Sequence, residues 1–197
     1  MKKILLTTIF MVIASNCFGA PIHDAIIKGD LNKVKELIKK DKKNNIEATD
    51  SSYNTPLYTA IRNAIYSKGT GEVVELQILD IGYENVPIST YLDIITYLVR
   101  RGANVEVTRM GNTPLYELVL SENTKYGDNN FKNNIFKIIK YLVEKGKAKI
   151  TDEMIVQASN RVKKYLKNEK KKREKMRKND FETRTEFLLE EEKMRKI

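Results

Sequence analysis

The sequence predicts an all-α protein built from about three consecutive helix–turn–helix units. Residues 54–58 and 112–116 both read Asn-Thr-Pro-Leu-Tyr, and residues 21–25 align with the stretch that begins at Pro56. Each stretch is followed by a segment that carries apolar residues at helical spacing. One such unit cannot bury its apolar face alone, so the units are predicted to stack into a continuous core.

The first helix of each unit is predicted to begin at the shared motif. The hydroxyls of Thr55 and Thr113 can cap the first turn, and Pro56 and Pro114 occupy the first helical position, where a missing N–H costs nothing. The first unit has Ala20 in place of the capping threonine. Terminal repeats are often atypical in this way.

The second helix of each unit is predicted from its apolar face. The repeated positions are Val34, Leu37 and Ile38 in the first unit, Ile95, Leu98 and Val99 in the second, and Ile139, Leu142 and Val143 in the third. Gly102 and Gly146 follow these helices, so both are predicted to be left-handed residues that end them.

Together these motifs resemble the ankyrin-repeat family over roughly residues 20–150. The resemblance implies a solenoid with repeats near 20–52, 53–107 and 108–150. A closing half-repeat at 151–160 completes a domain predicted to span 20–160. Tyr58 and Tyr116 replace the signature histidine, and Tyr53 replaces a turn glycine. His23 stands at the signature position, which favours a structural hydrogen-bonding role over catalysis.

Two insertions, at about 64–91 and 120–133, fall between the two helices of the second and third repeats. Residues 72–81 are apolar and fit either a helix or an extended segment. Residues 126–134 are rich in Asn and are predicted to be an exposed loop. The insertions are either surface padding or an accessory binding surface formed by the two together.

Residues 1–19 have the layout of a secretory signal peptide, with Lys2 and Lys3 ahead of an apolar run and Gly19 as the last residue removed. The protein is therefore expected to be exported, and to be periplasmic or secreted. The run is about ten residues, whereas a membrane-spanning helix needs roughly twenty. Lipidation at Cys17 is the weaker alternative, because Asn16 fits a lipobox poorly.

The formal charge of +10 is localised in one segment. Residues 161–178 hold eleven Lys or Arg against two Glu, whereas residues 20–160 are nearly neutral. The tail, residues 161–197, contains neither Gly nor Pro and is predicted to be a basic helix. The basic tract is either a solvated helix face or a polyanion-binding site, for which Lys170, Lys171, Lys172 and Arg173 are the candidate residues. As a ligand, an anionic membrane surface is preferred over nucleic acid, because no aromatic residues interleave with these bases and an exported protein meets little nucleic acid.

Catalysis has little support in the sequence. One histidine and one cysteine leave little material for His- or Cys-dependent chemistry, and no phosphate-binding glycine loop occurs. A carboxylate-only hydrolase is the remaining formal alternative. We expect no catalytic residues, metal, cofactor or small-molecule substrate.

The expected function is therefore binding of an as yet unidentified protein partner. The ankyrin resemblance implies that the first helices and the loop tips form the contact surface. The corresponding tip residues are Tyr53, Asn54, Arg109, Met110 and Asn112. The alternative is an envelope-associated structural protein that holds anionic surfaces through its basic tail.

Overall fold

The computed structural model describes residues 20–67, 86–124 and 127–195, and all regular elements in these ranges are α-helices. The chain divides into two compact units at residues 149 and 150. The helices of the first unit are α2 (Pro21–Ile27), α3 (Leu31–Lys40), α4 (Lys42–Asn45), α5 (Pro56–Tyr66), α6 (Ile88–Arg100), α7 (Pro114–Glu122) and α8 (Asn129–Glu144). The second unit contains α9 (Asp152–Gln157) and α10 (Asn160–Met194).

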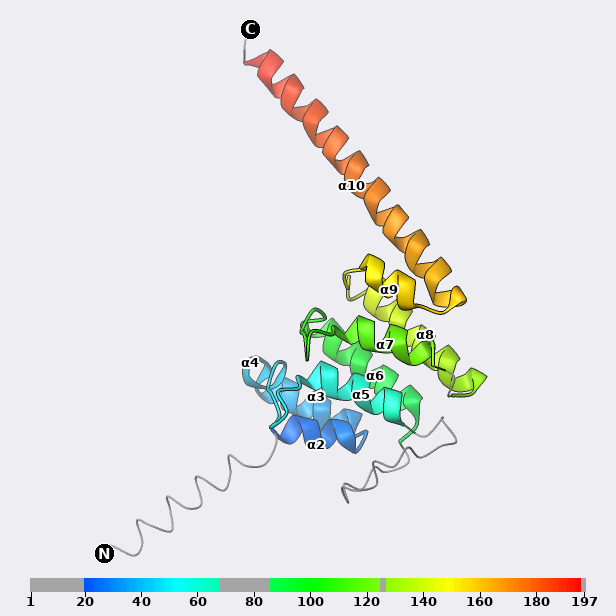
Figure 1. Cartoon of the computed structure of the whole chain (residues 1–197). Helices are drawn as coiled ribbons and strands as arrows, with labels where there is room; N and C mark the ends of the chain where they lie inside the picture. Colours follow the sequence, from blue (N-terminus) through cyan, green and yellow to red (C-terminus); the bar gives the residue numbers. More distant parts are fainter. Residues whose placement is uncertain (1–19, 68–85, 125–126, 196–197) are drawn as a thin grey trace, which may run out of the picture. The chain divides into compact units, whose positions relative to one another are not determined.

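The first unit consists of three helix pairs stacked side by side (Figure 1). Helix α2 packs on α3, α5 on α6, and α7 on α8. Between pairs, α5 contacts both α2 and α7, while α6 contacts both α3 and α8. The helices therefore form two layers, α2–α5–α7 and α3–α6–α8, with the apolar core between them.

The threonine and proline motif starts two of the first-layer helices as predicted. The hydroxyl of Thr55 accepts a hydrogen bond from the Tyr58 amide at 3.3 Å, and Thr113 accepts one from the Tyr116 amide at the same distance. Ala20 makes no side-chain cap on α2. Each cap satisfies an amide that the helix itself leaves without an acceptor.

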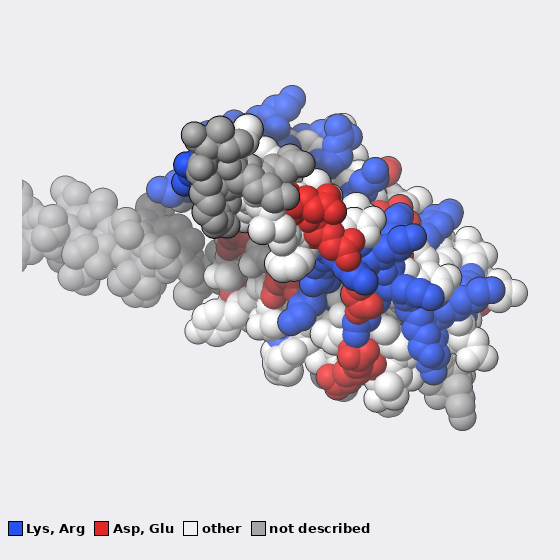
Figure 2. Space-filling model, turned by 90° about the horizontal axis from the view of Figure 1, so that it is seen from above, with Lys and Arg blue, Asp and Glu red and all other residues white. Residues whose placement is uncertain are grey.

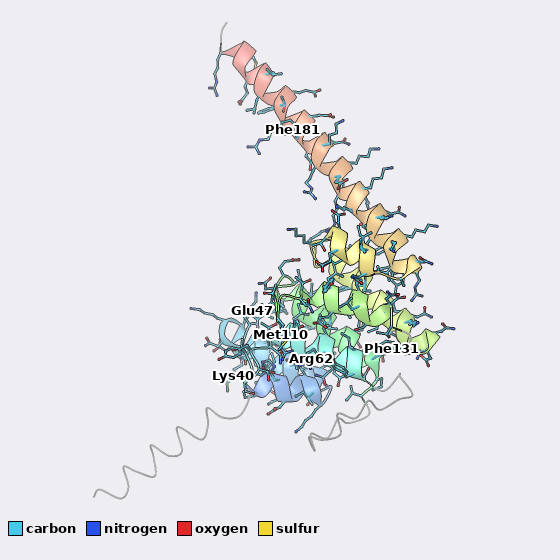
Figure 3. All side chains as sticks on the ribbon, in the orientation of Figure 1. Lys40, Glu47, Arg62, Met110, Phe131 and Phe181 are labelled. Carbon is cyan, nitrogen blue, oxygen red and sulfur yellow. The ribbon has the colours of Figure 1, made fainter. Side chains whose placement is uncertain are left out.

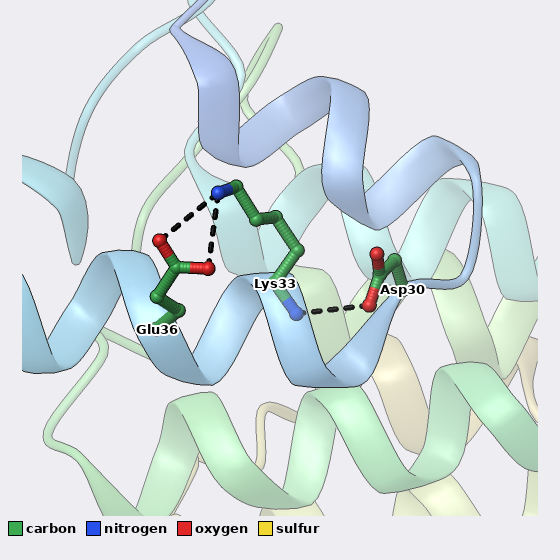
Figure 4. A network of polar contacts seen from close by, with 3 residues as sticks. All are labelled: Asp30, Lys33 and Glu36. Carbon is green, nitrogen blue, oxygen red and sulfur yellow. Dashed lines mark hydrogen bonds and ion pairs between the residues drawn. The ribbon is translucent and has the colours of Figure 1, made fainter.

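Helix α3 begins at a different cap, which was not predicted (Figure 4). Asp30 Oδ1 accepts a hydrogen bond from the Lys33 amide at 2.9 Å. One turn further, the Lys33 ammonium lies 3.0 Å from both carboxylate oxygens of Glu36. This exposed ion pair adds little stability, so the cap is the more important of the two contacts.

The apolar positions predicted from periodicity form the core. Fully buried side chains include Val34, Ile38, Leu57, Ile95, Leu98, Leu115, Ile139, Leu142 and Val143. Leu37 and Val99 are only half-buried, because they lie at the edges of their helical faces. The core is thus continuous through the three pairs.

The two predicted helix-ending glycines differ. Gly102 has φ +95°, and the Ala103 amide donates to Leu98 O at 3.0 Å, as in a left-handed helix end. For Gly146 the prediction is wrong, since the left-handed residue is Lys147, with φ +59°. The last turn of α8 is one residue wider, because the Gly146 amide donates to Tyr141 O five residues back.

Gly146 is needed for space instead. A Cβ at this position would lie 2.7 Å from Leu142 O and 3.1 Å from a methyl carbon of Val105. The glycine therefore permits close approach between the end of α8 and the loop between α6 and α7.

The prediction of an exposed loop over residues 126–134 is wrong for most of that stretch, because α8 begins at Asn129. Asp128 Oδ1 accepts a hydrogen bond from the Phe131 amide at 2.7 Å and so caps the helix. Phe131 is buried and lies four residues before the buried Ile135, which extends the apolar face of α8. The second insertion therefore lengthens a helix. Most of the first insertion, residues 68–85, lies outside the described residues, as does the predicted signal peptide.

The first helix of the second unit, α9, is capped by the Thr151 hydroxyl, which accepts a hydrogen bond from the Met154 amide at 3.2 Å. The predicted helical tail is α10, which packs on α9. Val162 and Leu166 are buried, whereas Met176, Phe181, Phe187, Leu188 and Leu189 are more than half exposed. Among the helices described, none combines the length and apolar character that a bilayer crossing requires.

Candidate protein-binding surface

Hydrogen bonds between neighbouring pairs fix the first-layer helices at the positions next to the loop tips. His23 Nε2 lies 2.8 Å from Ala48 O, and its Nδ1 lies 2.9 Å from the Thr59 hydroxyl. A carbonyl oxygen can only accept, so Nε2 carries a proton. The buried His23 is therefore a structural hydrogen-bonding residue, as its position in the motif predicts.

The second and third pairs are joined at the equivalent positions. The Tyr58 hydroxyl donates to Glu117 Oε1 at 3.0 Å, and the Asn112 amide group donates to the same oxygen at 3.1 Å. Burial of the phenol, together with its hydrogen bond to the carboxylate, raises the pKa of Tyr58 to about 12. Tyr58 therefore takes the place in the second pair that His23 occupies in the first.

The first loop tip is organised by the carboxylate of Asp50. Its Oδ1 accepts hydrogen bonds from the amides of Ser52 and Asn54 at 2.8 and 2.9 Å, and Oδ2 accepts one from the Asn54 side chain at 2.8 Å. Partial burial alone would raise the pKa of Asp50, but these bonds outweigh it and lower the pKa. The carboxylate thus holds Tyr53 at the tip, with φ +61° and 82% of its surface exposed.

The second loop tip is a two-residue hairpin. Arg109 and Asn112 exchange both backbone hydrogen bonds, at 2.9 and 3.0 Å. Met110 and Gly111 between them have φ +50° and +85°, a pair of left-handed residues typical of this kind of turn. Met110 is 89% exposed. A methionine in this conformation is uncommon, since only Gly, Asn and Asp adopt it readily.

Both tips therefore present a large apolar side chain on strained backbone. Such strain occurs preferentially at functional sites, where surrounding structure holds the residue in place. At Tyr53 that structure is the Asp50 network; at Met110 it is the hairpin itself. Neither side chain gains burial from its position.

The five predicted tip residues are not equivalent. Tyr53 and Met110 are the exposed pair, and Arg109 and Asn112 are half-buried beside them. Asn54 does not fit a contact role, because it is 5% exposed and its amide group is bound to Asp50. Its side chain faces the loop interior and helps to build the tip.

Sequence reasoning missed three acidic residues that fasten the loops. Besides Glu117, Glu47 Oε1 accepts a hydrogen bond from the Asn104 amide at 2.6 Å, and Glu106 Oε1 accepts one from the Lys149 amide at 2.7 Å. Glu47 and Glu106 occupy corresponding positions after the second helices of consecutive pairs. That correspondence was the signal available in the sequence.

The predicted basic cluster on α10 is only partly available. Lys170 pairs with Asp152 at 2.7 Å, and Lys172 lies 3.8 Å from Glu169. Exposed lysines follow one another along a single face of α10 at spacings of three and four residues: Lys164, Lys167, Lys171, Lys175 and Lys178. The last of them, Lys178, also lies 3.7 Å from Glu182. Figure 2 shows that Lys and Arg outnumber Asp and Glu on the surface seen from above.

Within the described ranges, no group of three or more His, Cys, Asp or Glu side chains is arranged to hold a metal ion. Comparisons of the chain with family models, with curated proteins and with solved structures found no match. The loop tips and the charged surfaces are therefore the features of the molecule that indicate a function.

Proposed function

We propose that the chain is an exported ankyrin-type repeat protein that binds another protein through its loop tips, and we assign it no catalytic role. The stacked helix pairs, the Thr-Pro starts and the hairpin between α6 and α7 support the ankyrin assignment. Export is supported by the signal-peptide pattern of residues 1–19.

The exposure of Tyr53 and Met110 carries the binding proposal. Aromatic residues and methionine are enriched at protein interfaces, where their apolar area is covered by the partner. Both side chains project from loops on a packed helical scaffold, which limits the entropy lost on binding. Arg109 and Asn112 supply polar groups beside them.

A capture experiment tests this function. The chain carrying Tyr53→Ser and Met110→Ser should lose proteins that the parent retains from a cell extract. The matched control carries Tyr66→Ser and Val156→Ser, because these side chains are also large, apolar and exposed. Equal retention by all three chains would reject the loop tips as the binding surface.

A second candidate is envelope attachment through α10, and the face of five exposed lysines favours it. Lysines near an anionic membrane surface contribute on the order of 1 kcal/mol each. Changing Lys164, Lys167, Lys171 and Lys175 to Glu should abolish sedimentation with vesicles that contain anionic lipid. Unchanged sedimentation would exclude this face as the attachment site.

A further inference from the structure

A second charged surface lies in the first unit, where the second-layer helices end. Each second-layer helix has a pair of apolar residues near its end, and basic residues follow each pair within two positions. They are Lys39 and Lys40 in α3, Arg100 and Arg101 at the end of α6, and Lys145 at the end of α8. Further lysines follow in the adjoining segments. We call the set the basic strip, and it comprises Lys39, Lys40, Lys42, Lys43, Arg100, Arg101, Lys145, Lys147 and Lys149, all exposed.

The helix dipole explains only part of this strip. A cation in the last turn interacts favourably with the negative end of the helix, which accounts for Lys39, Lys40 and Arg100. Lys42 and Lys43 lie in α4, whose four residues form a single turn that is both its first and its last, so the dipole gives them no preference. Lys147 lies beyond α8 in a left-handed conformation. These positions need another explanation.

The three parts of the strip are close to one another. Helix α6 contacts both α3 and α8, and packed helices lie about 8–10 Å apart. The Lys42 ammonium is 3.8 Å from the Cβ position of Gly102. The hydrogen bonds from the Asn104 amide to Glu47 and from the Lys149 amide to Glu106 join the three loops directly. The strip therefore extends across the ends of three helices.

Three of the four acidic residues near the strip are used to build the loops. Asp41 accepts hydrogen bonds from the backbone and side-chain amides of Asn44, and these bonds lower the pKa of Asp41. Glu47 and Glu106 accept the backbone bonds described above. In the part of the chain that the structure describes, no base of the strip lies within ion-pair distance of an acidic side chain.

We infer that the basic strip binds an acidic segment of a partner polypeptide, an inference that rests on the proposed protein-binding function and names the chemistry of its partner. The loop tips lie at the same end of the helices: Figure 3 labels Lys40, Glu47 and Met110 there, with Phe131 at the opposite end. A segment with spaced carboxylates and apolar residues can contact both the strip and the exposed Tyr53 and Met110.

A polypeptide fits this surface better than a nucleic acid does. Asp41, Glu47, Glu106 and Glu144 are interspersed among the nine bases. A phosphate backbone carries charge at regular, short intervals, so these carboxylates would repel it. A polypeptide can place its carboxylates opposite the bases alone and present other side chains elsewhere.

Binding of a labelled peptide to the full chain tests the inference by fluorescence anisotropy. The peptide has about ten residues, long enough when extended to cross three helix ends, and alternates Glu with Leu or Tyr. In the strip variant, Lys40, Lys42, Arg100 and Arg101 are changed to Glu. The matched tail variant has the same net charge and carries Lys167→Glu, Lys171→Glu, Lys175→Glu and Lys178→Glu.

The strip variant should bind the peptide about tenfold more weakly than the parent at low salt, with a much smaller loss in the tail variant. Equal losses, or a larger loss in the tail variant, would overturn the inference, because net charge or α10 would then account for binding. Circular dichroism of each variant establishes that the helices are retained. A DNA duplex that binds more tightly than the peptide, and in a strip-dependent way, would overturn the choice of a polypeptide.

The capture experiment separates failure of this inference from failure of the proposed function. If the strip variant retains the proteins that the Tyr53→Ser, Met110→Ser chain loses, the loop tips bind a partner but the strip does not. If the loop-tip chain loses nothing, the proposed function fails. If the acidic peptide still bound in a strip-dependent way, the basic strip would bind acidic segments independently of the loop tips.

Discussion

Replacing Tyr53 and Met110 with glycine tests whether the loop tips store backbone strain. Their φ values are +61° and +50°, and the left-handed region costs a non-glycine residue roughly 1–2 kcal/mol. Glycine gains about 0.5–1 kcal/mol of additional conformational freedom in the unfolded chain, which offsets part of the relief. Tyr53 is already 82% exposed and Met110 89% exposed, so the substitutions remove little buried surface. Each substitution should therefore raise the free energy of unfolding by about 0.5–1 kcal/mol.

Urea unfolding followed by helical circular dichroism measures this change. Ser52→Gly is the matched control, since Ser52 is exposed in the same loop but does not have positive φ. It should be neutral or destabilise by about 0.5–1 kcal/mol. A Tyr53→Gly chain as destabilised as the Ser52→Gly chain would refute the strain argument. A chain that gains stability yet loses its partner would show that these side chains serve binding at the expense of folding.

Three further predictions concern single contacts. Tyr58→Phe should lower the free energy of unfolding by about 1–2 kcal/mol in urea titrations, because Glu117 loses a donor. The pKa of Tyr58 is raised to about 12, so its contribution to the free energy of unfolding is complete below pH 10 and is lost as the pH rises through 12. The Tyr58→Phe variant should not show this loss. The pKa of Asp50 is lowered, so its contribution to the free energy of unfolding has the opposite pH dependence: it is present above pH 3.8 and is lost as the pH falls through the lower folded-state pKa. In Asp50→Ala the free energy of unfolding should therefore fall less steeply as the pH is lowered. Gly146→Ala should destabilise by roughly 1–3 kcal/mol in thermal unfolding, because its Cβ would lie 2.7 Å from Leu142 O; an unchanged midpoint would contradict the close approach.

Local rules predicted much of the helical architecture. Thr55 and Thr113 form their caps within three residues of sequence, so the motif alone was sufficient. Helical periodicity identified the buried residues because burial on a packed helix follows the same period. The errors at Gly146 and at residues 129–134 arose where a wider final turn and the burial of Phe131 decided the outcome.

The candidate surface was less predictable. The tip positions followed from the repeat alignment, but the alignment treated Asn54 and Tyr53 alike. Their environments are opposite, since Asp50 draws the Asn54 side chain inward while Tyr53 projects outward. The basic strip was not predicted because its nine residues are spread from 39 to 149 and appear as short, separate charge pairs in the sequence.

The sequence by itself determined where α5 and α7 begin, which positions face the core, and that positive charge concentrates in α10. These properties depend on residues within a few positions of one another, such as a cap and its amide or successive turns of one face. Only the tertiary structure decided which side chains remain exposed and which charges meet. Stacking the helix pairs aligned three distant helix ends, and the loop hydrogen bonds that hold them engaged neighbouring carboxylates while leaving the lysines and arginines of the basic strip exposed.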